Sequence, residues 1–165
     1  MNWFKSCRCV EDVKQQYKEL IKQWHPDVCS RADATKTMSQ INNEYEAAFN
    51  RLKNTHRSAA AEETYYQKET NETFDEYRDI LEALIHYPGI VIEVIGSWLW
   101  VSGETKPIKE ELKKLGFQFS AKKISWYFHF EPYHKKHGKK FTMEELRQMW
   151  GSREVETKER QAIGV

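Results

Sequence analysis

The 165-residue sequence contains little cysteine, no long apolar run and almost no net charge. Its three cysteines form no Cys-x-x-Cys pair, so we expect free thiols of a reducing compartment and no disulfide framework. No apolar run is long enough to span a bilayer and the N-terminus lacks a signal-peptide pattern, so we expect a cytoplasmic protein with no membrane partner. The net charge of +1 excludes a strongly basic protein as a whole, and a mean hydropathy of −0.82 predicts good solubility.

Metal-binding side chains are present but are poorly arranged for a site. Two sets could be imagined: Cys7, Cys9, Cys29 and His25, and His129, His134 and His137. The first set lacks the paired cysteine spacing of zinc sites, and the second lacks acidic partners nearby. We therefore expect no metal and no cofactor.

The first clear pattern predicts an amphipathic helix over residues 11–24. Four large side chains recur at i, i+4, i+7 and i+11 and form one stripe: Val13, Tyr17, Leu20 and Trp24. A second stripe of Lys14, Lys18 and Lys22 lies roughly 130° from the first. The helix is therefore expected to bury one face and to present a line of ammonium groups on another.

The tripeptide His25-Pro26-Asp27 follows directly after this helix. A residue before proline is disfavoured in the α conformation, so His25 is expected to end the helix and to lie exposed on a loop. Asp27 is expected to accept hydrogen bonds from nearby backbone amides, as aspartate commonly does in turns. Taken alone the tripeptide is typical of an ordinary turn, and only its context favours a functional role.

A second amphipathic helix is predicted after a short polar loop, with Asp33 as its N-cap. Five bulky side chains recur at spacings of 3, 4, 4 and 3 on one stripe: Met38, Ile41, Tyr45, Phe49 and Leu52. Two helices with facing apolar stripes and a short connection form an antiparallel pair. The tripeptide is then displayed at the tip of that pair.

Residues 3–52 resemble the J-domain of DnaJ-type co-chaperones. The aromatic pair Trp3-Phe4 resembles the opening of that family's short first helix, and Trp24 stands at an aromatic position just before His-Pro-Asp. The core positions of the two longer helices are matched by Val13, Tyr17 and Leu20 and by Ile41, Tyr45 and Phe49.

The resemblance implies a partner and a mechanism. J-domains bind an ATP-bound DnaK-type (heat-shock seventy) chaperone and trigger its ATP hydrolysis, and the His-Pro-Asp loop engages the partner near its interdomain linker. The basic helix face meets an acidic surface of the chaperone, where charges speed encounter and set orientation. The chaperone-binding residues implied are His25, Pro26, Asp27, Lys14, Lys18 and Lys22.

For the three lysines alone, a solvated helix face without a partner is the alternative. The hydrolytic chemistry belongs to the chaperone, and His25 has no nucleophile or base-orienting neighbour in sequence. We therefore expect that this chain is not an enzyme.

Three features of longer DnaJ proteins are absent from the sequence. No Gly/Phe-rich linker follows residue 52, no repeated Cys-x-x-Cys-x-Gly-x-Gly zinc module is present, and residues 53–61 match the basic fourth helix poorly. The chain thus resembles a minimal J-domain fused to a different unit.

Residues 57–88 are expected to form an acidic helical connector. Eight acidic and two basic residues lie between positions 62 and 82, and apolar residues at helical spacing predict a helix over residues 71–86, ended by Pro88-Gly89. This acidic surface could fold back onto the lysines of the first helix and mask them. A solvated helix face is the favoured alternative.

After Gly89 the period changes to two, which is typical of strands. Strands are predicted over residues 90–95 and 98–101, with Trp98 and Trp100 on one face. A helix from Pro107 to a C-cap at Gly116 follows.

A second predicted hairpin, of residues 117–119 and 124–130, completes a ββαββ module. The last predicted helix covers residues 142–150 and begins with a Thr142/Glu145 capping box. The tract of residues 98–130 resembles, loosely, a module in short J-domain proteins of phages and other mobile elements, which supplies no established activity.

The chemistry of this module has more than one interpretation. Between residues 104 and 140 ten lysines stand against four glutamates and are interleaved with aromatic residues, a composition typical of single-stranded nucleic-acid binding. The favoured alternative is that the aromatic side chains only form the core of a small domain, and a third is a surface that brings a client protein to the chaperone. The possible nucleic-acid or client surface comprises Trp98, Trp100, Lys122, Lys123 and Trp126.

The sequence thus predicts an α+β protein of four parts: a helical J-domain with an antiparallel helical hairpin (1–56), the acidic connector (57–88), a small basic, aromatic ββαββ-like domain (89–151) and a charged tail (152–165). The predicted function is a co-chaperone that stimulates ATP hydrolysis by a DnaK-type chaperone, with the C-terminal domain contacting a client protein or nucleoprotein complex. The alternative is a nucleic-acid-binding accessory protein in which the J-like helices are only a scaffold.

Overall fold

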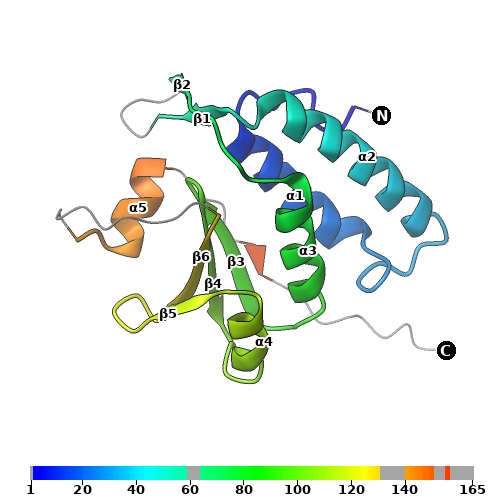
Figure 1. The fold of residues 1–165 in the computed structure, drawn as a ribbon. Helices are drawn as coiled ribbons and strands as arrows, with labels where there is room; N and C mark the ends of the chain where they lie inside the picture. Colours follow the sequence, from blue (N-terminus) through cyan, green and yellow to red (C-terminus); the bar gives the residue numbers. More distant parts are fainter. Residues whose placement is uncertain (1, 59–63, 131–139, 151–154, 157–165) are drawn as a thin grey trace, which may run out of the picture.

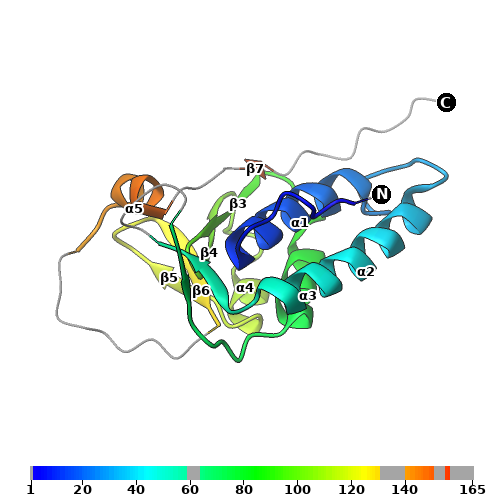
Figure 2. The same cartoon turned by 90° about the horizontal axis from the view of Figure 1, so that it is seen from above.

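The computed structural model describes residues 2–58, 64–130, 140–150 and 155–156 (Figure 1). Helices α1 (Val10–Trp24), α2 (Ala34–Leu52) and α3 (Phe74–Leu84) lie together on one side, and the larger sheet lies beside them. Helix α5 (Met143–Trp150) lies on the far side of that sheet, as both views show (Figure 1, Figure 2). The mixture of helices and antiparallel sheets agrees with the predicted α+β class.

Helices α1 and α2 form the predicted helical hairpin, held by a stack of two tyrosines. The rings of Tyr17 and Tyr45 are 4.0 Å apart with an interplanar angle of 17°, and the Tyr17 hydroxyl donates to Asn42 Oδ1 at 2.9 Å. The buried side chains include the predicted stripe positions Val13, Tyr17, Leu20, Met38, Ile41, Tyr45 and Phe49. Helical periodicity located this part of the core correctly, since each stripe faces the other helix.

Asp33 occupies the N-cap position of α2, as predicted, but its side chain does not cap the helix. Its backbone lies in the right-handed helical region, whereas a capping residue normally uses the extended region to reach the amides of the first turn. The carboxylate instead accepts a hydrogen bond from Arg31 Nε at 3.2 Å.

A small hairpin of β1 (Thr55–Arg57) and β2 (Tyr65–Gln67) follows α2 and was not predicted. The first turn of α1 holds it in place: Glu11 Oε1 is 3.0 Å from His56 Nδ1, and Glu11 Oε2 accepts from the Arg57 amide at 3.1 Å. Burial raises the pKa of Glu11, but the hydrogen bonds from His56 and Arg57 outweigh it and lower the pKa below its ordinary value. A hairpin that depends on partners 45 residues away leaves no local signal in the sequence.

Helix α3 falls within the predicted connector helix and packs against both α1 and α2. Its N-terminus carries a capping box, in which Glu76 N donates to Thr73 Oγ1 and Thr73 N donates to a Glu76 carboxylate oxygen. The Tyr77 hydroxyl donates to the carbonyl oxygen of Lys14 at 3.0 Å. This acidic helix is therefore part of the helical layer.

The larger sheet has the strand order β5-β6-β4-β3-β7, and all of its neighbours are antiparallel. Its strands are β3 (Ile90–Ile95), β4 (Trp98–Gly103), β5 (Gln118–Ser120), β6 (Ser125–His129) and β7 (Val155–Glu156). Together with the short helix α4 (Lys109–Lys114), the first four give the predicted ββαββ order. The second hairpin extends the first because β6 pairs with β4.

The two faces of this sheet have different neighbours. Ile92, Val101 and Trp126 point to the face that carries the apolar core, since residues paired across strands share a face. On the other face, the Glu93 carboxylate receives two hydrogen bonds from the Arg147 guanidinium of α5, at 2.7 and 2.8 Å. Helix α5 begins with the predicted Thr142/Glu145 capping box.

Most of the buried apolar side chains form one cluster that joins the helices to the sheet. It runs from Phe4 and Tyr45 in the helical layer, through Leu81 and Leu84 of α3, to the sheet residues. A shared core of this kind favours cooperative unfolding of both layers.

We expect Leu81→Ala to destabilise the helices and the sheet together, by about 2–5 kcal/mol, because Leu81 is fully buried in the shared cluster. Urea unfolding, followed by circular dichroism and by tryptophan fluorescence, measures the loss of stability. The transition midpoints from the two probes should fall together to the same lower urea concentration. Glu82→Ala, at the neighbouring position whose side chain is 40% exposed, should change the free energy of unfolding by less than about 0.5 kcal/mol. Two separate transitions, only one of them shifted, would contradict a shared core.

Candidate functional site

The loop that carries His25-Pro26-Asp27 begins where α1 ends. His25 is the C-cap, with φ −62° and ψ 134°, and its amide still donates to Ile21 O at 2.9 Å. Its carbonyl oxygen accepts from the amides of Val28 and Cys29 at 3.0 and 2.8 Å. The helix therefore ends at the predicted residue, and the following loop turns back tightly on His25.

Within the loop, the His25 ring is oriented by its neighbours. Its Nδ1 accepts a hydrogen bond from the Asp27 amide at 3.2 Å and lies 3.7 Å from Asp27 Oδ2. An Nδ1 that accepts leaves the proton of the neutral ring on Nε2. The His25 side chain is 17% exposed and that of Asp27 61%, so the expectation of an exposed His25 was wrong for most of its ring.

Aromatic and cationic side chains brace the base of the loop. The rings of Trp24 and Trp3 meet edge to face at 6.3 Å, and the Arg31 guanidinium lies 4.5 Å above the Trp24 ring. Trp24 thus connects the chain's N-terminal turn, the end of α1 and the residues just before α2.

Lys14, predicted to lie on an exposed basic face, is buried, with 2% of its surface exposed. Its ammonium forms an ion pair with the buried carboxylate of Glu72 and lies 4.6 Å from the centroid of the Phe130 ring. Burial raises the pKa of Glu72, although Lys14 acts in the opposite direction. The prediction of an exposed Lys14 was therefore wrong.

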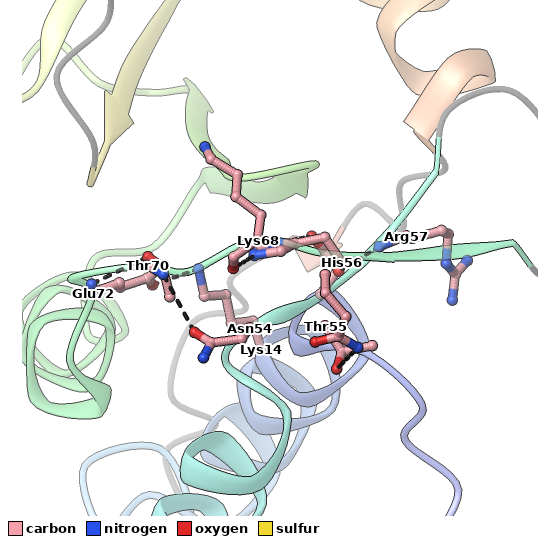
Figure 3. Close-up of polar contacts among 10 residues, drawn as sticks. Lys14, Asn54, Thr55, His56, Arg57, Lys68, Thr70 and Glu72 are labelled. Atoms are coloured by element: carbon pink, nitrogen blue, oxygen red, sulfur yellow. Dashed lines mark hydrogen bonds and ion pairs between the residues drawn. The ribbon is translucent and has the colours of Figure 1, made fainter.

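Glu72 ends a short irregular segment, residues 68–72, that we call the strap. The Lys68 amide donates to the Asn54 carbonyl oxygen at 2.8 Å, and the Thr70 amide donates to Asn54 Oδ1 at 3.3 Å. Figure 3 shows Lys68, Thr70 and Glu72 following one another along the strap, close to Asn54 and Lys14. The strap thus attaches to Asn54, just after the end of α2, and places the Glu72 carboxylate against Lys14 of α1.

Lys18 is also 2% exposed, contrary to the prediction. Its ammonium donates to the carbonyl oxygen of Ile92 in β3 at 3.0 Å, and burial lowers the pKa of Lys18 to about 8. Lys22 is half-buried. Of the three predicted lysines, only Lys22 reaches the surface, because residues up to 74 positions away cover the other two.

A cavity of about 1260 Å³ brings together four of the five residues predicted for a nucleic-acid or client surface: Trp98, Trp100, Lys122 and Lys123. The rings of Trp98 and Trp100 are stacked 5.9 Å apart, and Lys123 Nζ lies 5.7 Å from the Trp100 ring centroid. Trp126 is a correction: it points to the opposite sheet face and belongs to the apolar core.

Other residues of the cavity were not anticipated from the sequence. Lys68 and Tyr66 come from the unpredicted hairpin and the strap, and Lys140, Arg147 and Trp150 come from α5 and the residues before it. Along the part of the chain that the structure describes, six lysine and arginine side chains line the cavity against three glutamates. The basic composition of residues 104–140 was the one sequence signal for this surface.

No group of three or more His, Cys, Asp or Glu side chains among the described residues is arranged to hold a metal ion. Burial raises the pKa of the Cys7 thiol to about 11 and that of Cys9 to about 12, so both are protonated at neutral pH. Two of the histidines considered for metal binding, His134 and His137, lie outside the described residues.

Part of the chain is similar to proteins named DnaJ homolog subfamily C member 16. The protein from Mus musculus is 34% identical over 84 residues, which is 47% of this chain and 11% of the mouse protein. The protein from Rattus norvegicus is 31% identical over 83 residues, with the same coverage of each chain. The chain thus spans only about a tenth of the length of these curated relatives.

No protein-family model and no solved structure matches the chain. The limited similarity to the two DnaJ homologues suggests a DnaJ-like family in general terms. Among the residues that the structure describes, no helix is both long and apolar enough to cross a membrane.

The pH dependence of stability tests the burial of Lys18. Its pKa is about 8 in the folded chain and 10.5 ordinarily, so between those values the unfolded chain binds more protons and the contribution of Lys18 to stability rises with pH. We therefore compare the free energy of unfolding of the wild type with that of Lys18→Met. Between pH 7.5 and pH 9.5, the difference should shift by about 2 kcal/mol in favour of the wild type.

Urea unfolding of both proteins at the two pH values measures this difference. Tyrosine and cysteine side chains also ionise in this pH range, but they are the same in both proteins, so their effects cancel. Lys36→Met, at an exposed position of α2, serves as the matched control and should follow the wild type at both pH values. Parallel profiles for the wild type and Lys18→Met would show that the Lys18 ammonium is solvated.

Proposed function

We propose that this chain is a J-domain co-chaperone that binds a DnaK-type chaperone through His25-Pro26-Asp27 and stimulates its ATP hydrolysis. The observation that carries this proposal is the loop geometry: a compact turn at the end of the tyrosine-packed hairpin, with an ordered His25 ring and an exposed Asp27 carboxylate. The similarity to two DnaJ homologues supports the same partner class.

In this proposal the chain is a binding and regulatory protein, not an enzyme, and needs no cofactor. Hydrolysis takes place in the chaperone, while this chain supplies a rigid loop whose shape is set before binding, which lowers the entropy cost of association. Half-buried Lys22 lies one helical turn before the loop and is less buried than Lys14 and Lys18. A cytoplasmic location, where such chaperones are found, is part of the proposal.

The C-terminal sheet would then contact the target, either a client protein or a nucleoprotein complex. The loose resemblance of residues 98–130 to short J-domain proteins of phages and mobile elements remains a prediction. The two relatives found are mammalian proteins and do not bear on it.

We expect His25→Gln and Asp27→Asn each to abolish stimulation of a DnaK-type chaperone in single-turnover ATP hydrolysis. Loss of a central contact of an interface typically weakens binding by about 2 kcal/mol, or roughly 30-fold. Because the His25 ring is mostly covered, the more exposed Asp27 provides the variant less prone to disturb the fold.

Asp33→Asn is the matched control, since it removes a half-exposed carboxylate from the same loop region without touching the tripeptide. It should stimulate as well as the parent. A well-folded parent that does not stimulate, or an Asp27→Asn variant that stimulates normally, would overturn the proposed function.

A second candidate function is binding of single-stranded nucleic acid in the basic cavity. The specific observation in its favour is the stacked pair Trp98–Trp100 in a cavity lined by twice as many cationic lysine and arginine side chains as glutamates. Such sites hold phosphates with lysines and bases with aromatic rings.

We expect a labelled oligothymidylate to bind with an affinity that falls steeply as salt rises, measured by fluorescence anisotropy. Replacing both Lys122 and Lys123 with alanine should flatten the log–log salt slope by about 1.4, because each of the two lost phosphate contacts contributes about 0.7 on a single strand. Alanine at Lys113 and Lys114 of α4, which are exposed and outside the cavity, is the matched control. Salt-independent or equal binding by both double variants would exclude this site.

A further inference from the structure

The basic side of α1 is covered from within the chain, at two points of different character. Lys18 is held by a backbone carbonyl oxygen inside the sheet, at Ile92. Lys14 is held by a side chain, the Glu72 carboxylate at the end of the strap. A backbone carbonyl within a sheet moves only with the sheet, whereas a glutamate side chain can leave its partner by changing its own rotamer.

The contact between Lys14 and Glu72 is costly to form and easy to replace. Both side chains are almost fully buried, with 3% and 5% of their surfaces exposed, so each loses hydration and their attraction mainly offsets that loss. A carboxylate from another molecule could take the place of Glu72 without leaving Lys14 unpaired. The net cost of such an exchange is therefore small compared with the cost of exposing a bare buried charge.

Polar contacts at a few points, besides this ion pair, hold the strap. Its backbone attachments to the helical layer are the two amide hydrogen bonds to Asn54, at 2.8 and 3.3 Å, and the His56 ring lies 3.2 Å from the Lys68 carbonyl oxygen. The rings of Phe130 and Tyr77 also cover Lys14, at 4.6 and 5.6 Å from its ammonium nitrogen. Tyr77 belongs to α3, which packs on α1 and stays with it.

Lys14 also lies within reach of a partner that binds the loop. It precedes His25 by eleven residues on the same helix, a distance of about 16 Å along the axis. One protein surface can span that distance, since a standard interface buries about 800 Å² on each partner.

We propose that Glu72 is an internal substitute for an acidic surface of the chaperone: it keeps Lys14 concealed in the free chain, and an incoming carboxylate displaces it during docking. The free chain is then a latent co-chaperone, which is opened by release of the strap. This inference rests on the proposed function and adds a concealed contact residue and the segment that conceals it.

The first test is the reactivity of lysine amines toward an acetylating reagent, quantified by mass spectrometry on the full chain. In the parent, Lys14 and Lys18 should react at least about tenfold more slowly than exposed Lys36, because modification requires local opening. Glu72→Lys places a like charge against Lys14 and should raise the reactivity of Lys14 to near that of Lys36, while Lys18 stays protected.

Glu69→Lys is the matched control, with the same charge change at an exposed position of the strap. It should leave Lys14 protected. Phe130→Ala is a second opening variant, which removes one cover of Lys14 without changing charge. Circular dichroism melts identify any variant that fails to fold.

The second test is single-turnover ATP hydrolysis by a DnaK-type chaperone at increasing concentrations of each variant. When the strap is released, a larger fraction of the chain is in the state that can dock. Glu72→Lys and Phe130→Ala should therefore lower the half-maximal concentration for stimulation at least about threefold. Glu69→Lys should behave like the parent.

Two outcomes overturn the proposal, and they differ. If the parent and the opened variants stimulate equally and Lys14 remains protected from acetylation in the complex, the concealment of Lys14 plays no part in docking, although the co-chaperone function stands. If neither the parent nor a folded, opened variant stimulates, the proposed function and this inference fall together.

Discussion

The burial of helix α1 on two faces is the constraint on which the rest of the structure depends. On one face, Tyr17 stacks on Tyr45 of α2. On the other, the ammonium of Lys18 donates to a carbonyl oxygen of the sheet and that of Lys14 pairs with Glu72. A charge taken out of water must keep a partner, so the sheet and the helices cannot separate unless solvent or another acid reaches α1. The apolar cluster between the layers also holds the sheet against the helices.

The His25-Pro26-Asp27 loop lies at the end of α1 and is set by its own neighbours. Proline ends the helix, the Asp27 amide orients the His25 ring, and the Asp27 carboxylate remains exposed. The chain therefore combines an exposed carboxylate on this loop with two lysines that are buried on the preceding helix. In the proposed function, the chaperone contacts the loop first. The electrostatic contacts of the buried lysines become available only after a rearrangement.

The similarity to the two DnaJ homologues covers less than half of this chain and about a tenth of the relatives. It bears on the class of protein and leaves the role of the sheet to be argued from its own geometry. In the cavity, lysine side chains from several separate segments of the chain surround the stacked rings of Trp98 and Trp100. In the proposed function, the choice between a protein and a nucleic-acid target of the sheet depends on how those segments pack together.

The sequence by itself determined the elements whose signals are local. Stripes of apolar residues located α1, α2 and their buried faces, Pro26 located the end of α1, and capping residues such as Thr142 located the start of a helix. Tertiary structure alone decided that Lys14 and Lys18 are concealed, that strand β1 pairs with β2, and that Trp126 faces the core. The first two outcomes depend on partners 45 to 74 positions away, and the third depends on the pairing of β6 with β4. Periodicity shows which residues share a face of one element, but what covers that face is set by the packing of distant elements and by the need of each buried charge for a partner.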